Sequence, residues 1–120
     1  KLAAGLMTMG GELIDLAREP VDHDLDATGI FQQLEGLVEQ QLERARSHHE
    51  VRPVAVGVGC AGPIAPNCAA VSPLNIRAWH NFPLRDRLMQ VSDLPVYGDL
   101  DAKALALAEG WVGAAQGRMN

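Results

Sequence analysis

Positively charged residues are few in this chain: its 120 residues include 10 Lys and Arg against 15 Asp and Glu, a net charge of -5 at neutral pH. This balance disfavours a nucleic-acid partner, because such binding depends largely on cations that neutralise phosphates. The nearest approach to a basic cluster, residues 44–49, is flanked by Glu43 and Glu50. It also lies near the end of an expected helix, where cations complement the helix dipole. We therefore expect no nucleic-acid partner for this segment.

Long apolar runs and closely paired cysteines are also missing. No run reaches the ~20 apolar residues that span a bilayer, and no secretory leader precedes the first expected strand. These absences favour a cytoplasmic protein without a membrane partner. Cys60 and Cys68 are separated by seven residues, which is not the spacing of a zinc knuckle or a redox dithiol, and the four histidines are scattered. We predict two ordinary thiols and no metal site.

Aromatic residues make up only 4% of the chain, but the apolar fraction is 48% and the charged fraction is 21%. This composition is typical of an ordinary folded α/β or helical protein and argues against a disordered chain. A chain of this length can bury a single sizeable core. We therefore expect one domain, or a piece of one.

The first half of the chain carries the signals of a hairpin and a helix. Two short apolar segments, residues 2–8 and 12–19, flank a glycine turn and predict a β-hairpin. Asp26 can cap a helix N-terminus, and apolar residues recur with helical spacing from Ile30 to Ala45. This pattern predicts an amphipathic helix that ends near residue 46.

The second half alternates strands and helices. Residues 54–58 form a nearly continuous apolar run, which predicts a central strand covered on both faces. An irregular segment follows, and Pro83 then marks the start of a short helix. Residues 94–97 predict another strand, and residues 102–115 are rich in Ala and Leu, which favours a closely packed helix.

This order of elements predicts an α/β architecture, with helices flanking a mixed sheet. Ligands of such sheets bind beyond the carboxyl ends of the strands. Two loops occupy that position here, residues 59–63 and residues 98–101. They are the first places to look for a functional site.

Asp99 and Asp101 stand where a strand is expected to pass into a helix. Carboxylates at the N-terminus of a helix face the positive end of the helix dipole, which favours their ionised form. One of them could act as a general base, since phosphoryl transfer to an alcohol needs a single carboxylate that accepts the hydroxyl proton. The pattern alone favours the alternative, in which both aspartates are helix caps.

Other polar and aromatic residues of this region have two interpretations each. Gly59 and Gly62 could let backbone N–H groups approach a ligand, or could simply form a turn. Asn75 could hold a sugar hydroxyl, or could bond its own backbone. Trp79 could line a cleft, or could fill the core.

Taken together, the ordered segments resemble the ROK family of sugar kinases and sugar-responsive repressors. Residues 1–6 look like the strand that follows the family's Asp-x-Gly-Gly-Thr phosphate loop, and Val-Gly-Val-Gly-Cys-Ala-Gly-Pro at 56–63 looks like its glycine-rich turn. Asp-Ala-Lys-Ala-Leu-Ala-Leu-Ala-Glu-Gly-Trp at 101–111 looks like the helix that begins at the catalytic aspartate. Residues 72–79, 82–88 and 94–96 continue in family order.

The resemblance implies an actin-like ATPase domain of the ribonuclease H-like type, incomplete at both ends. Residues 1–120 would be an N-terminal piece that lacks the first strand with its phosphate loop and the C-terminal domain. The implied reaction uses ATP with Mg²⁺ to phosphorylate a hexose, glucose first, at its 6-hydroxyl. Asp101 matches the catalytic base, and Gly62 and Asn75 match loops around the sugar. The implied full-length protein is a homo-oligomer, and no residue of this segment is assigned to ATP.

Leu100 departs from the family pattern, which has Asn directly before the catalytic aspartate to hold sugar hydroxyls. Leucine cannot form hydrogen bonds, and a sugar hydroxyl buried without a partner costs roughly 1–3 kcal/mol. We therefore expect an altered sugar preference or a weakened kinase.

Three functions stay open at this point. The first is a sugar kinase, whose isolated residues 1–120 we expect to be inactive, because half of each binding site lies elsewhere. The second is the sugar-sensing domain of a ROK repressor, which needs no catalytic base. The third is a structural remnant with no activity.

Overall fold

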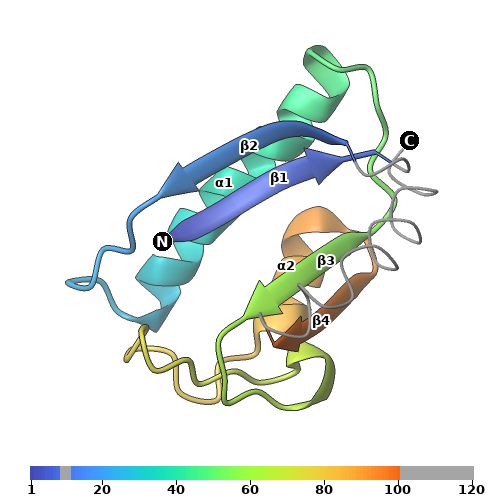
Figure 1. Ribbon diagram of the computed structural model, residues 1–120. Helices are drawn as coiled ribbons and strands as arrows, with labels where there is room; N and C mark the ends of the chain where they lie inside the picture. The colour runs from blue at the N-terminus through green and yellow to red at the C-terminus, as the bar shows by residue number, and fades with distance from the viewer. Residues whose placement is uncertain (9–11, 101–120) are drawn as a thin grey trace.

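The N-terminal hairpin forms as the sequence predicts. The computed structural model of the protein describes residues 1–8 and 12–100. Strand β1 (Leu2–Met7) pairs antiparallel with strand β2 (Leu13–Glu19), and helix α1 (Ala27–Ser47) lies across one face of this pair (Figure 1). Alternate positions of β1 are buried at Leu2 and Leu6, as expected for a strand with one covered face.

Helix α1 begins at the cap that the sequence predicts. The Asp26 side chain accepts a hydrogen bond from the Gly29 backbone N–H, with 2.7 Å between Oδ1 and N. This bond satisfies one of the N–H groups that the first turn leaves unpaired. From Phe31 on, the buried positions follow at intervals of three and four residues, and all except Gln41 are apolar: Ile30, Phe31, Leu34, Leu37, Gln41 and Ala45.

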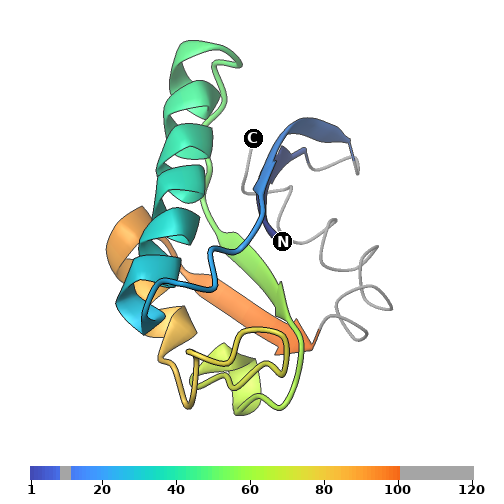
Figure 2. The same ribbon diagram turned by 90° about the vertical axis from the view of Figure 1, so that its left-hand side faces the viewer.

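A second pair of strands carries the carboxyl-terminal part of the described chain. Strand β3 (Val56–Cys60) pairs in parallel with strand β4 (Val96–Leu100), and helix α2 (Leu84–Ser92) precedes β4. Figure 2 shows α1 and α2 on the same side of these strands. Leu84 and Leu88 of α2 are almost completely buried, as the predicted helical face requires.

The α/β prediction holds for the described residues, whose strands pair both in parallel and antiparallel but not in one continuous sheet. They form two separate ladders, one antiparallel and one parallel, and no ladder joins β1 to β3. Within residues 1–8 and 12–100, β3 has one covered face, whereas the sequence predicts two. Val56, Val58 and Cys60 pack against the core, but Gly57 and Gly59 between them are exposed. The apolar run is therefore a period-two pattern in which glycine takes the open face.

Aromatic residues from the loop between β3 and α2 complete the core. Trp79 is only 3% exposed, stacks on Phe82 with ring centroids 4.7 Å apart, and donates its indole N–H to the Ala27 carbonyl at 3.1 Å. Phe82 in turn lies 5.7 Å from the ring of Phe31 on α1. Trp79 thus belongs to the core, which was one of its two interpretations, and it fastens the loop to the start of α1.

The hairpin is attached to the other end of α1 by a charged cluster around Asp15. The Asp15 carboxylate is 12% exposed and accepts from Arg44 Nε at 2.6 Å and from His49 Nε2 at 2.7 Å. Gln41 Nε2 lies 3.5 Å away. The hydrogen bond from His49, and next that from Arg44, hold the pKa of Asp15 far below its ordinary value.

This cluster predicts a loss of stability in acid. Because the pKa of Asp15 is lowered in the folded state, its contribution to stability is complete above the unfolded value near ~4. The contribution shrinks as the pH falls below that value and is lost only below the still lower folded-state pKa. We expect Asp15→Asn to lower the melting temperature at pH 7, and the difference from wild type to shrink at pH 3. Thermal unfolding followed by circular dichroism measures both differences.

Glu39→Gln, which removes an exposed carboxylate from α1, is the matched control for this experiment. It should leave the melting temperature near that of wild type at both values of pH. A difference between Asp15→Asn and wild type that stays constant from pH 7 to pH 3 would contradict the role given to this carboxylate.

Candidate functional site

The carboxyl ends of β3 and β4 lie side by side. The parallel register pairs Cys60 with Leu100, the last residues of the two strands. The loop that starts at Ala61 and the chain that continues to residue 101 therefore leave the same edge. The prediction that two loops meet at this edge is confirmed up to Leu100, and Asp101 itself lies outside the described residues.

The strands extend further toward this edge than the sequence predicts. Gly59 lies inside β3, and Gly98 and Asp99 lie inside β4. The backbone of Asp99 is thus paired with Gly59 as part of a ladder, and the helix expected over residues 102–115 lies outside the described residues. Glycine in such a pattern indicates a turn, whereas Gly59 and Gly98 lie within strands and Gly98 packs closely against Cys68.

The two predicted sugar-loop residues occupy different environments. Gly62 is partly buried just after β3, and its peptide bond to Pro63 is cis. Asn75 is exposed in a turn that closes with a hydrogen bond from Ile76 N to Pro73 O at 3.1 Å. Both belong to the segment of residues 61–82 that covers the carboxyl ends of β3 and β4 (Figure 1).

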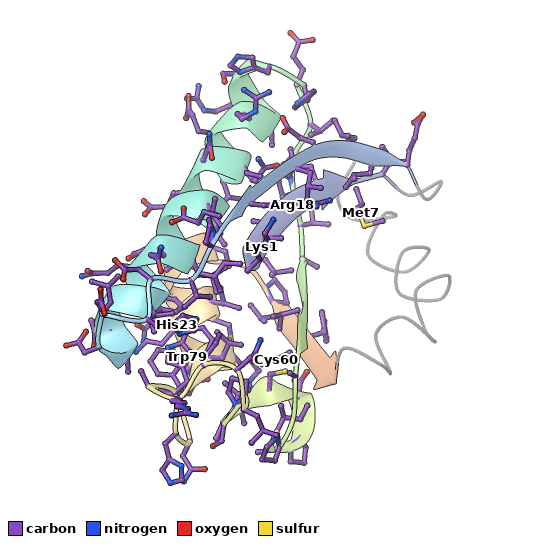
Figure 3. The ribbon with its side chains drawn as sticks, turned by 60° about the vertical axis from the view of Figure 1, so that its left-hand side comes forward. Lys1, Met7, Arg18, His23, Cys60 and Trp79 are labelled. Atoms are coloured by element: carbon purple, nitrogen blue, oxygen red, sulfur yellow. The ribbon has the colours of Figure 1, made fainter. Side chains whose placement is uncertain are left out.

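That segment is more ordered than its sequence indicates. Val71 and Phe82 exchange backbone hydrogen bonds of 2.9 Å in each direction, and Val71 also forms a bridge with Ile64. Ser72 Oγ accepts from Asn81 N at 2.8 Å. Figure 3 shows Trp79 beside the first turn of α1 and Cys60 near the carboxyl end of β3. Contacts with the core and within the segment thus hold residues 61–82 in place beside the carboxyl ends of β3 and β4.

Two residues of the site have no counterpart in the sequence-based prediction. Asn67 and Cys68 form the short 3₁₀ turn Pro66–Cys68 with left-handed backbone angles, and the Asn67 side chain accepts a hydrogen bond from Gly98 N. The dipeptide Pro-Asn is a turn signal, and Asn adopts left-handed angles more readily than most residues. Those signals indicate a turn but not its contact with β4.

The described residues offer no ready-made cation site. Among residues 1–8 and 12–100, no group of three His, Cys, Asp or Glu side chains is placed to hold a metal ion. The arrangement instead provides a strand edge, a glycine-containing loop and an exposed amide. Such an edge can bind a small polar ligand with backbone and amide groups.

In the described part of the chain, no helix has both the length and the apolar character needed to cross a membrane.

Comparisons with known proteins agree with the sequence resemblance. A glucokinase of Halalkalibacterium halodurans is 28% identical over 116 residues, which is 95% of this chain and 34% of that protein. The solved structure of a Listeria monocytogenes protein, described as a candidate N-acetylmannosamine kinase, superposes with a TM-score of 0.60 at 25% identity. The match covers 95% of this chain and 36% of that structure. The chain thus spans about a third of the length of these relatives.

The family assignment depends on the whole chain and not on a single motif. The model of the ROK family matches residues 1–120. The predicted resemblance is therefore confirmed: the chain belongs to the ROK family.

Proposed function

We propose that the full-length protein is an ATP-dependent hexose kinase, with glucose as the first candidate and Asp101 as its base. The observation that carries this proposal is the register of β3 and β4. It brings the glycine loop and the chain leading to Asp101 to one edge, where a sugar hydroxyl could meet a carboxylate. The names of the two relatives, both sugar kinases, support the same class of reaction.

The role of Asp101 follows from the needs of phosphoryl transfer. The attacking hydroxyl must lose its proton, and a carboxylate within hydrogen-bond reach can accept it. ATP with Mg²⁺ would supply the transferable phosphoryl group and neutralise its charge. The groups of this chain would orient the sugar, with the backbone near Gly62 and the exposed amide of Asn75 as candidate contacts.

We propose further that residues 1–120 form the N-terminal part of an actin-like domain. Both ladders lie on the same side of α1 (Figure 2), yet β1 and β3 each have only one ladder partner among the described residues. A strand that precedes Lys1 and carries the phosphate loop would join them into the single mixed sheet. The separation of the ladders supports this arrangement.

A sugar sensor is the second candidate, and Leu100 is the residue that favours it. An apolar side chain beside the proposed base removes a partner for sugar hydroxyls. A repressor needs no phosphoryl transfer, so a site with weakened catalysis or an altered sugar preference is compatible with this function. DNA binding that changes with an added sugar would identify this function.

The test is an assay of the full-length protein with ATP against a panel that includes glucose and N-acetylmannosamine. We expect formation of ADP and a sugar 6-phosphate with at least one hexose, and no turnover by residues 1–120 alone. The isolated segment is the control for contaminating kinases. No turnover with any hexose, together with sugar-dependent DNA binding, would establish the sensor and exclude the kinase.

A further inference from the structure

A hydrogen bond joins the 3₁₀ turn after β3 to the backbone of β4. Asn67 Oδ1 accepts from Gly98 N at 2.6 Å, across 31 residues of sequence. Val56 N donates to Pro95 O, so alternate residues of β4, beginning at Pro95, face β3. Gly98 therefore presents its N–H to the opposite, outer edge of the strand. The Asn67 side chain thus occupies the side of β4 that faces away from β3, where another strand could otherwise pair.

The contact is also sterically tight. A Cβ atom on Gly98 would lie 2.5 Å from Cys68 Cβ, 2.6 Å from Cys68 Sγ and 3.0 Å from the Asn67 carbonyl oxygen. Cys68 itself is 0% exposed. Only glycine fits at position 98 without displacing the turn, so the turn and the strand fix each other's position.

The turn holds an unfavourable backbone conformation to make this contact. Asn67 has a φ of 60° and Cys68 a φ of 55°, both in the left-handed region. Asn adopts this region more readily than most residues, whereas Cys adopts it rarely. Backbone hydrogen bonds from Cys68 to Ala65 and from Ala65 to Ala70 keep the turn closed. Such conformations persist where surrounding contacts determine them and are frequent at functional sites.

We infer that Asn67 is a positioning residue for the end of β4, and through it for Asp101. This inference rests on the proposed kinase function. Strand β4 ends at Leu100, two residues after Gly98, and Asp101 is the next residue in the sequence. A shift of about 1 Å in a reacting group can cost on the order of a hundredfold in rate. Fixing the strand at Gly98 restricts where the carboxylate can stand relative to the sugar hydroxyl.

Two substitutions in the full-length protein separate the hydrogen bond from the backbone conformation. Asn67→Gly accepts the left-handed angles but loses the acceptor, whereas Asn67→Asp keeps an acceptor oxygen at the same place. We expect Asn67→Gly to lower kcat about tenfold with the KM for ATP nearly unchanged. Asn67→Asp should have a kcat close to that of wild type. A merely structural role of the position would not require this recovery by a variant that keeps the acceptor oxygen.

Asn81→Gly is the matched control, because Asn81 is exposed, has a φ of 50° and belongs to the same loop. It should leave kcat unchanged. A wild-type kcat in Asn67→Gly would overturn the inference, as would an equal loss in Asn67→Asp or in Asn81→Gly. Melting temperatures of all three variants show whether a loss of kcat comes from unfolding.

Amide hydrogen exchange at Gly98 tests the contact without any activity. Asn67→Gly should speed exchange of the Gly98 N–H several-fold, and Asn67→Asp should not. Unchanged exchange in Asn67→Gly would show that the contact does not hold the strand. A wild-type protein that turns over no hexose but shows the exchange effect would remove the proposed function, and with it the catalytic part of the inference, while the contact would stand.

Discussion

Asp101→Asn in the full-length protein is expected to lower kcat by about 10²–10⁴-fold, the range typical of a lost general base. Asparagine has nearly the same shape as aspartate but cannot accept the hydroxyl proton. Because asparagine can still form a hydrogen bond with a sugar hydroxyl at this position, the KM for the hexose should change little. Steady-state kinetics with coupled detection of ADP gives both parameters.

The control for this substitution is Asp93→Asn. Asp93 ends α2 with a left-handed φ of 56°, which asparagine also tolerates, and the change removes the same charge. It should leave kcat unaltered. Sugar binding by Asp101→Asn, measured by calorimetry, shows that the variant is folded. If Asp101→Asn keeps half of the wild-type kcat, Asp101 is not the base.

Leu100→Asn is expected to tighten hexose binding by about 10- to 100-fold. The estimate follows from the roughly 1–3 kcal/mol that an unpaired buried hydroxyl costs, and an added amide would remove that cost. The effect should appear as a lower dissociation constant for the preferred hexose. Calorimetric titration of the full-length protein measures it directly.

Leu13→Asn provides the comparison, because Leu13 is an exposed leucine of the hairpin, on β2. It makes the same chemical change away from the β3 and β4 edge and should not alter sugar binding. If Leu100→Asn binds every tested hexose no better than wild type, Leu100 is not the reason for altered sugar recognition.

The elements set by local patterns could be predicted from the sequence. The hairpin depends on two apolar runs and a glycine turn, and α1 depends on its Asp26 cap and on regularly spaced apolar residues. These signals lie within a few residues of one another, and the structure confirms them. Helix α2 likewise starts directly after Pro83.

The ends of β3 and β4 were harder to predict, because glycine occurs both in turns and in strands that pack closely against a neighbour. Gly59 and Gly98 have the composition of a turn, yet each lies within a strand. What distinguishes Gly98 is its contact with Cys68, thirty positions away in the sequence, and local patterns hold no information on such a contact. The prediction of a strand that ends at residue 97, before Gly98 and Asp99, has the same origin.

The sequence predicts which loops form the candidate site, but not the long-range contacts that hold these loops in place. The meeting of the two loops follows from the α/β pattern and is confirmed by the register of β3 and β4. The function of Asp101 stays a prediction. The bond from Asn67 to Gly98 and the bridge between Val71 and Phe82 join distant segments, so only the structure reveals them.

The attachment of Trp79 to α1 has a consequence for the energetics of ligand capture. Its stacked indole and its hydrogen bond to Ala27 keep the segment that carries Asn75 ordered before any ligand arrives. A sugar that docks against Asn75 would therefore meet a preorganised surface, and little conformational entropy would be lost on association. Selectivity among sugars would then depend on the shape of a rigid binding surface and not on a loop that becomes ordered around the sugar.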